Sequence, residues 1–197
     1  KRGRVNGVDD VDGEGGGGGE EEKEEASRRL RAACNEGDVE GVRKALEDGA
    51  DVDAVGEPDE GLGRRWPLFL AAHPRHGNNE EIVKMLIDAG CDVSQASGLG
   101  ATALHYVVDE QGKTSIVEAL LRAGANVDAQ DGDGSTVLMR CLSGEPNMEH
   151  LRLLLQHGAS PNIANKLGYT ACHHAETAEA VEIMLSSGGD ARLRDKD

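Results

Sequence analysis

The chain has 197 residues, a formal net charge of −16 and only four aromatic side chains. This length suits one domain with a tail. No apolar run within it is long enough to span a bilayer or to form the core of a signal peptide. The negative charge disfavours a nucleic-acid partner, because a phosphate backbone would be repelled.

Residues 1–25 are rich in glycine and glutamate, with a homopolymer at Gly15–Gly19 and an acidic run at Glu20–Glu25. With almost no apolar side chains, this segment cannot offset the entropy lost on ordering, so we predict a disordered acidic tail. The acidic run could bind a basic partner, but a run of like charges is more often simply solvated.

From residue 26 onward the sequence repeats a unit of two short helices, seen best in residues 100–131. Thr102 can cap a first helix, and Gly124 can close a second helix in the left-handed conformation. Each helix carries one apolar stripe at helical spacing: Leu104, Val107 and Val108 in the first, and Ile116, Val117, Leu120 and Leu121 in the second. Neither stripe can be buried within one unit, so the unit needs neighbours.

The neighbours recur along the chain at regular intervals. The helix-closing glycines are spaced 41, 34, 34 and 30 residues apart, at Gly49, Gly90, Gly124, Gly158 and Gly188. The helix-opening position is held by Trp66, Thr102, Thr136 and Thr170. From a closing glycine to the next opening threonine the interval is 12 residues in all three cases. This periodicity predicts an all-α solenoid of stacked helix-turn-helix units joined by β-hairpin-like loops.

The first-helix segments WPLFLAA, TALHYVV, TVLMRCL and TACHHAE resemble the T-P-L-H-x-A element of ankyrin repeats. Segments such as IVEALLRAGANV resemble the second helix and hairpin of that family. The resemblance implies an ankyrin domain over residues 26–197, with repeats at about 27–59, 65–97, 100–131, 134–165 and 168–197. In the first repeat Arg28, Arg29 and Arg31 replace the motif residues, which is typical of a capping repeat with a charged outer face.

The resemblance also implies a structural role for two histidines. His105 and His173 stand at the motif position, where the imidazole bonds the opening threonine and tethers the neighbouring hairpin. Phe69 and Met139 replace this histidine in two other repeats, so we expect packing alone to hold those junctions.

The sequence gives little support for a metal site, a calcium loop or a reactive thiol. Cys172, His173 and His174 are adjacent and point in different directions on a helix, so they cannot share one metal ion. The run from Asp131 to Gly134 lacks the closing glutamate of a calcium loop, because Leu142 stands at position twelve, and we interpret it as a hairpin turn. Cys34, Cys91, Cys141 and Cys172 form no C-x-x-C pair, which indicates buried thiols in a reducing compartment. We predict no metal, no cofactor and no catalytic site.

The resemblance implies a concave recognition face, built from hairpin tips and first helices. The partner-binding candidates on this face are Arg65, Trp66, His73, Leu99, Asp109, Glu110, Asp133, Ser135, Arg140, Lys166 and Tyr169. Trp66, Arg65 and Tyr169 come first, because Trp, Tyr and Arg often dominate the energetics of interfaces. The alternative for Trp66 is that it packs onto the long loop preceding it.

We therefore expect a monomeric, non-enzymatic protein-interaction module, an adaptor, scaffold or inhibitor, in the cytoplasm or nucleus. Its acidity predicts a partner with a basic patch. One alternative is a regulatory or substrate-recruiting segment of a larger enzyme or channel whose catalytic part lies outside this chain, and another is a structural spacer. The chain starts at Lys1 and stops one residue before the next expected loop glycine, so we expect the natural protein to continue.

Overall fold

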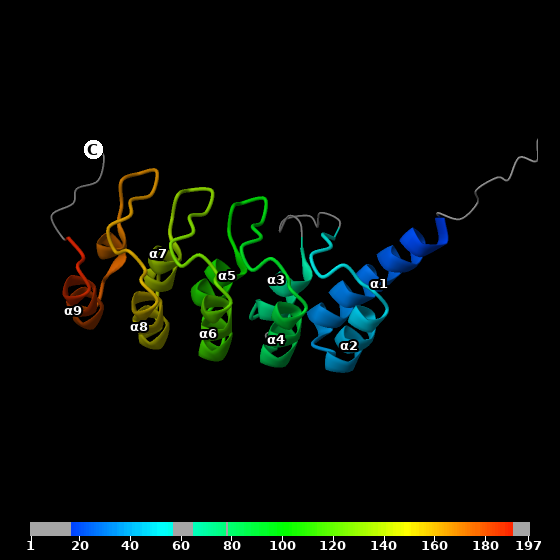
Figure 1. Ribbon diagram of the computed structural model, residues 1–197. Helices are drawn as coiled ribbons and strands as arrows, with labels where there is room; N and C mark the ends of the chain where they lie inside the picture. Colours follow the sequence, from blue (N-terminus) through cyan, green and yellow to red (C-terminus); the bar gives the residue numbers. More distant parts are fainter. Residues whose placement is uncertain (1–16, 57–64, 78, 191–197) are drawn as a thin grey trace, which may run out of the picture.

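A computed structural model describes residues 17–56, 65–77 and 79–190 of the chain. Within these ranges the chain forms pairs of helices that stand side by side in a row (Figure 1). In chain order the elements are α1 (Gly17–Glu36), α2 (Val39–Glu47), α3 (Pro67–Ala72), α4 (Glu80–Asp88), α5 (Ala103–Asp109), α6 (Thr114–Arg122), α7 (Val137–Leu142), α8 (Met148–Gln156), the 3₁₀ helix η1 (Ala171–His174) and α9 (Ala178–Ser186). The prediction of an all-α solenoid is confirmed.

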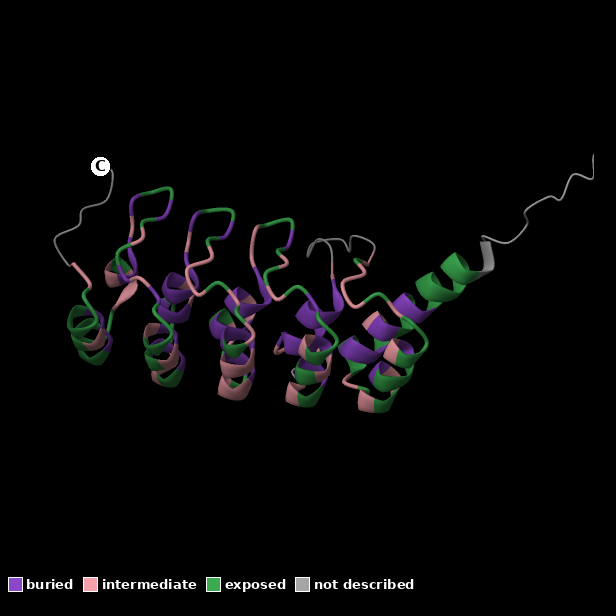
Figure 2. Cartoon of the chain, in the orientation of Figure 1, coloured by how far each residue is buried: buried purple, intermediate pink, exposed green. Residues whose placement is uncertain are grey.

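One continuous apolar core runs along the row, from Leu30 in α1 to Met184 in α9. First helices pack against first helices and second helices against second helices of the next pair. Figure 2 shows the buried residues on the facing sides of these helices, and Leu104, Leu120, Leu138 and Leu154 are completely buried there. The apolar stripes read from the sequence therefore form the interfaces between repeats.

The ends of the second helices follow from local chemistry. The five closing glycines have φ between +83° and +89°, a region that costs glycine little and other residues more. At the other end, Asn79 and Asn147 accept hydrogen bonds from backbone N–H groups of the first turns of α4 and α8. These caps fix where each second helix begins and ends.

The structure corrects part of the predicted disordered tail. Residues 1–16 lie outside the described residues, but 17–25 form the first turns of α1, which extends beyond the row in Figure 1. Glutamate and lysine favour helix, and the helix propagates from a packed anchor at Ala26 and Ser27, both buried. The Ser27 hydroxyl donates to the Lys23 carbonyl and accepts from the Asp51 N–H, at 2.8 and 2.9 Å.

The last described pair differs from the others. Its inter-helix turn is shorter than those of the second, third and fourth pairs, and its first helix is reduced to the single 3₁₀ turn η1. Val181 and Leu185 of α9 are 37% and 48% exposed, whereas Leu151, at the position in α8 that matches Val181, is completely buried. The residues that a following pair covers elsewhere are thus open to solvent at this end of the described chain.

His150 is an exception within the core. At the equivalent position α2 has Gly41, and the other second helices have an apolar side chain, Ile82 in α4, Ile116 in α6 and Ala180 in α9. The His150 side chain is completely buried, and neither ring nitrogen has a hydrogen-bond partner among the described residues. Burial lowers the pKa of His150 below its ordinary value of 6.5, against smaller opposing effects of the Glu149 carboxylate and the Gly112 carbonyl nearby.

His150→Ile should stabilise the fold, by about 1 kcal/mol at neutral pH, because it removes an unsatisfied polar group from an apolar site. The unfolded chain binds a proton near pH 6.5 that the folded chain excludes, so the wild type loses stability as the pH falls below that value. The stability difference should therefore widen between about pH 8 and about pH 5. Urea denaturation of both proteins measures it.

The matched control is His157→Ile, which removes an exposed imidazole from the end of the same helix. A stability gain for His150→Ile that stays constant across this pH range would show that the imidazole does not resist protonation in the folded state. A loss of stability at neutral pH would show that His150 has a partner in the core.

Candidate binding face

The hairpin-like loops project together from one edge of the row of helices (Figure 1). Antiparallel bridges between Ala96 and Thr102, and between Gln130 and Thr136, close two of these loops. We call the surface made by loop residues 94–101, 128–135 and 162–169 with α5, α7 and η1 the loop face.

Each of the three loops is held from inside by one short polar side chain. Asp131 Oδ1 accepts hydrogen bonds from the N–H groups of Asp133 and Ser135, at 2.9 and 3.0 Å. Asn165 and Ser97 make the same pair of bonds in their own loops, at 3.0 Å and 3.3 Å respectively. The three residues are spaced by 34, so the repeat period sets the shape of the loops as well as that of the helices.

Neighbouring loops are also bonded to one another. The Gly132 N–H donates to the Leu99 carbonyl at 2.7 Å, and the Lys166 N–H donates to the Asp133 carbonyl at 3.0 Å. A Cβ atom at Gly132 would lie 2.8 Å from the Leu99 oxygen, so glycine is required for this close approach. These bonds fix the positions of the loop tips relative to one another in the free chain.

A second set of bonds links the loop bases. The side chain of Asp53 accepts from the Asp92 N–H at 3.0 Å, and that of Asp128 accepts from the Ser160 N–H at 2.8 Å. Asn162 accepts from the Asp190 N–H in the same way, at 2.8 Å. Each acceptor lies four residues after a closing glycine. The sequence contains this recurrence, but only the structure shows that these side chains bond the backbone of the next repeat.

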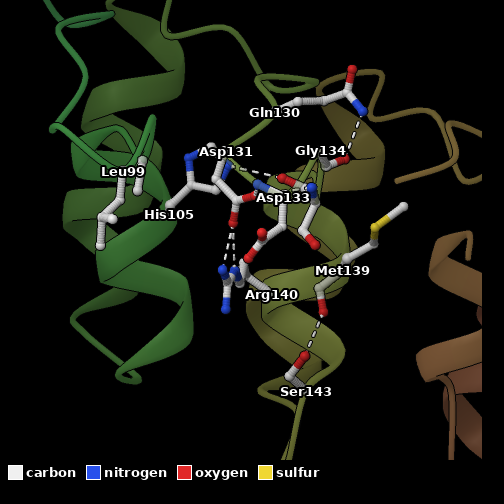
Figure 3. Close-up of polar contacts among 12 residues, drawn as sticks. Leu99, His105, Gln130, Asp131, Asp133, Gly134, Met139, Arg140 and Ser143 are labelled. Carbon is white, nitrogen blue, oxygen red and sulfur yellow. Dashed lines mark hydrogen bonds and ion pairs between the residues drawn. The ribbon is translucent and has the colours of Figure 1, made fainter. Parts of the chain in front are cut away.

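An ion pair lies between loop 128–135 and α7 (Figure 3). Arg140 donates from Nε and Nη2 to Asp131 Oδ2, at 2.8 and 2.5 Å, and the Asp131 side chain is only 2% exposed. Burial by itself raises the pKa of Asp131, but the bonds from Arg140 and from two backbone N–H groups outweigh it and hold the pKa below its usual value. Asp131 is therefore a fully engaged carboxylate.

His105 has the geometry of a neutral structural side chain. Its Nδ1 accepts from the Thr102 N–H at 3.2 Å and lies 3.0 Å from the Thr102 hydroxyl. Its Nε2 lies 3.4 Å from the Ser135 carbonyl of the next repeat, which places the proton on Nε2. Burial lowers the pKa of His105, so the ring stays uncharged at neutral pH. His173 Nδ1 contacts Thr170 in the same way.

The loops and first helices of the third and fourth repeats enclose a groove of about 420 Å³. Four of the predicted binding residues, Leu99, Asp109, Asp133 and Arg140, line it together. Leu99 reaches it from one loop, and Asp133 and Arg140 from the next repeat (Figure 3). The groove thus combines an exposed aliphatic side chain with several charges.

Two predicted contact residues do not reach the surface. Trp66 is 1% exposed and packs against Phe69, with ring centroids 5.3 Å apart. His73 is 3% exposed and packs against the rings of both Phe69 and Tyr106. The prediction that they contact a partner is wrong, because both face the core next to α3. The loop onto which Trp66 was alternatively expected to pack lies largely outside the described residues.

Of the remaining candidates, Ser135, Lys166 and Tyr169 belong to the loop face, whereas Arg65 precedes α3 and Glu110 follows α5. Arg65 and Ser135 are half-buried, and Lys166 is exposed. Glu110 is half-buried and paired with Arg75, whose Nε lies 2.7 Å from Glu110 Oε2. Tyr169 is half-buried against the ring of His173, at 5.5 Å. None of these residues lines the groove.

The sequence analysis missed Tyr106, which lines the groove and donates from its hydroxyl to Ser97 Oγ at 3.3 Å. Tyr106, Arg140 and His174 occupy equivalent positions, 34 residues apart. Aligning the first helices at this interval would have marked Tyr106 as a neighbour of Arg140.

No group of three or more His, Cys, Asp or Glu side chains is arranged to hold a metal ion within 17–56, 65–77 and 79–190. Burial raises the pKa of the Cys34, Cys91 and Cys141 thiols to about 12, so they are not nucleophilic thiolates. Among the described helices, none is both long and apolar enough to cross a membrane.

Comparison with known proteins identifies the repeating unit. A family model for ankyrin repeats, comprising three copies, matches residues 30–131 and again residues 104–195. These overlapping matches contain all five helix pairs of the described chain apart from the first turns of α1. A search of curated proteins found no match.

Asp131→Ala should destabilise the chain by about 1–3 kcal/mol, because it leaves two N–H groups and the Arg140 guanidinium without their acceptor. Asp131→Asn should cost less, since Asn165 makes the same two backbone bonds in the next loop. Thermal and denaturant unfolding of both variants measure the costs. Equal losses for Ala and Asn would mean that the Arg140 pair, and not the loop bonds, provides the stabilisation.

Proposed function

This chain belongs to the ankyrin repeat family, and we propose from that premise that it is a non-enzymatic module that recognises another protein through its loop face. Ankyrin repeats are generally protein–protein interaction modules, and the family is typically non-catalytic. The roles we assign within that class are those of an adaptor, scaffold or inhibitor.

The observation that carries the proposal is the exposure of aliphatic side chains at the loop tips. Leu99 and Leu167 are 67% and 65% exposed, more than any other large apolar side chain among the described residues. Both stand on loops whose shape is fixed by internal hydrogen bonds, so their exposure does not result from a loosely packed segment. Rigid presentation of apolar groups lowers the entropy lost on binding.

The proposal extends to the compartment. All four cysteines are free thiols, and three of them are buried within the repeats. A chain that uses cysteine as a small apolar core residue is suited to a reducing, intracellular environment.

Capture from a cell lysate tests the proposal. The wild-type chain should retain a protein that Leu99→Asp/Leu167→Asp loses by at least about tenfold, because charged tips cannot be buried against an apolar partner surface. The control is Glu81→Gln/Glu182→Gln, which alters exposed residues of the second helices α4 and α9 and should leave capture unchanged. All three proteins are first shown to melt alike.

Equal retention by the loop-tip variant and the wild type would place recognition on another surface. If none of the three proteins retains a specific partner, the evidence would favour the alternative that this segment regulates, or recruits substrates to, an activity located elsewhere.

A further inference from the structure

The charges of the groove between the third and fourth repeats do not balance. Its lining holds the carboxylates of Asp109, Asp131 and Asp133 and one guanidinium, that of Arg140. Asp131 and Arg140 neutralise each other in a close ion pair. The carboxylates of Asp109 and Asp133 are exposed, and within the described part of the chain neither takes part in a hydrogen bond or ion pair.

The cations around the groove are already engaged. Arg75 is paired with Glu110, at 2.7 Å. Lys166 donates from its ammonium group to the neutral Gly132 carbonyl, which holds the ammonium in place without cancelling its charge. Arg140 donates two hydrogen bonds to the Asp131 carboxylate, whose charge balances that of the guanidinium. Asp109 and Asp133 also lie near enough to Arg140 to help raise its pKa. The lining nevertheless holds three carboxylates against one guanidinium, and this net negative charge attracts a cationic group.

The loop tips around this charge are apolar. Leu99, Asp133 and Leu167 occupy the same position in three consecutive loops, 34 residues apart, and we call them the tip row. Its two leucines are about two-thirds exposed, so a partner that covers them removes apolar surface from water, which favours binding. The tip row therefore presents an aliphatic, an acidic and an aliphatic group in succession.

We propose that the tip row, together with Asp109, binds an extended segment of a protein partner in which a lysine or arginine is flanked on both sides by aliphatic side chains. The cation lies between Asp133 and Asp109, and the flanking side chains cover Leu99 and Leu167. This inference rests on the proposed function and adds the chemistry of the partner to it.

The repeat spacing sets the distance between these partner residues. Packed helices lie about 8–10 Å apart, so successive loop tips recur at about that distance. A polyproline II segment advances about 3.1 Å per residue and completes a turn in three residues. Its side chains at every third position therefore face the same surface about 9 Å apart, which predicts the pattern aliphatic-x-x-(Lys/Arg)-x-x-aliphatic.

Selection from a displayed library of random dodecapeptides tests this inference, with the full chain immobilised. The wild type should enrich peptides that carry a cation with aliphatic residues three positions away. Asp109→Asn/Asp133→Asn should weaken binding of the selected peptides by about tenfold at low salt, with a smaller effect at high salt. Glu81→Gln/Glu182→Gln removes the same number of charges from the second helices and should leave binding unchanged.

The other outcomes separate this inference from the proposed function. Selected peptides without a cationic preference, whose binding is lost with Leu99→Asp/Leu167→Asp but not with the asparagine variant, would overturn the inference and leave recognition by the loop face standing. Peptide binding that withstands every loop-face substitution, or the absence of any selected peptide, would overturn the inference and count against the proposed function as well.

Discussion

Packing between successive helix pairs is the interaction on which the rest of this structure depends. Each described α-helix after α1 is only six to nine residues long, and η1 is shorter still, so none would be stable alone in water. Each carries one apolar stripe, and the stripe is buried only when the next pair covers it. Where no described pair follows, on α9, Val181 and Leu185 stay open to solvent. The stability of each helix pair thus depends on packing against the neighbouring pairs in the row.

This packing has a consequence for the loops. Because the helices impose a fixed offset between repeats, the loops of neighbouring repeats meet at the same relative position each time, and short backbone bonds can form between them. The bond from Gly132 to Leu99 and the bond from Lys166 to Asp133 are two examples. Buried Asp131 and His105 then connect the loops to the first helices. The loop face is therefore held rigid by its hydrogen bonds to the packed helices.

Much of the fold was predictable because periodicity encodes it directly. Closing glycines and helical stripes each signal their own structural role, and the helices begin and end near the predicted residues. The predictions that failed depend on side-chain directions and contacts that periodicity does not encode. Trp66 occupies a cap position, where spacing alone does not distinguish a side chain that turns inward from one that faces solvent. The first turns of α1 have no apolar stripe, yet they form on an anchor at Ala26 and Ser27.

Only part of the candidate site could be read from sequence, for a related reason. Leu99, Asp109, Asp133 and Arg140 were chosen by their place in the repeat, and the structure brings them to one groove. That the Arg140 charge is already matched by Asp131 depends on a contact across nine residues of loop and helix, which no spacing rule specifies. The close approach at Gly132 likewise exists only between two repeats.

The helical core stabilises the fold and the side chains at the loop tips contribute little to it, so the tips can carry unpaired charge. The side-chain carboxylates of Asp109 and Asp133 make no hydrogen bond within the described fold, and the side chains of Leu99 and Leu167 bury little area within it. Replacing them changes few of the contacts that hold the repeats together, so these positions are under little structural constraint. The core fixes the spacing of the side chains along the tip row and leaves their chemistry open, as the proposed function requires. Under that proposal, the negative groove between two exposed leucines serves recognition rather than folding.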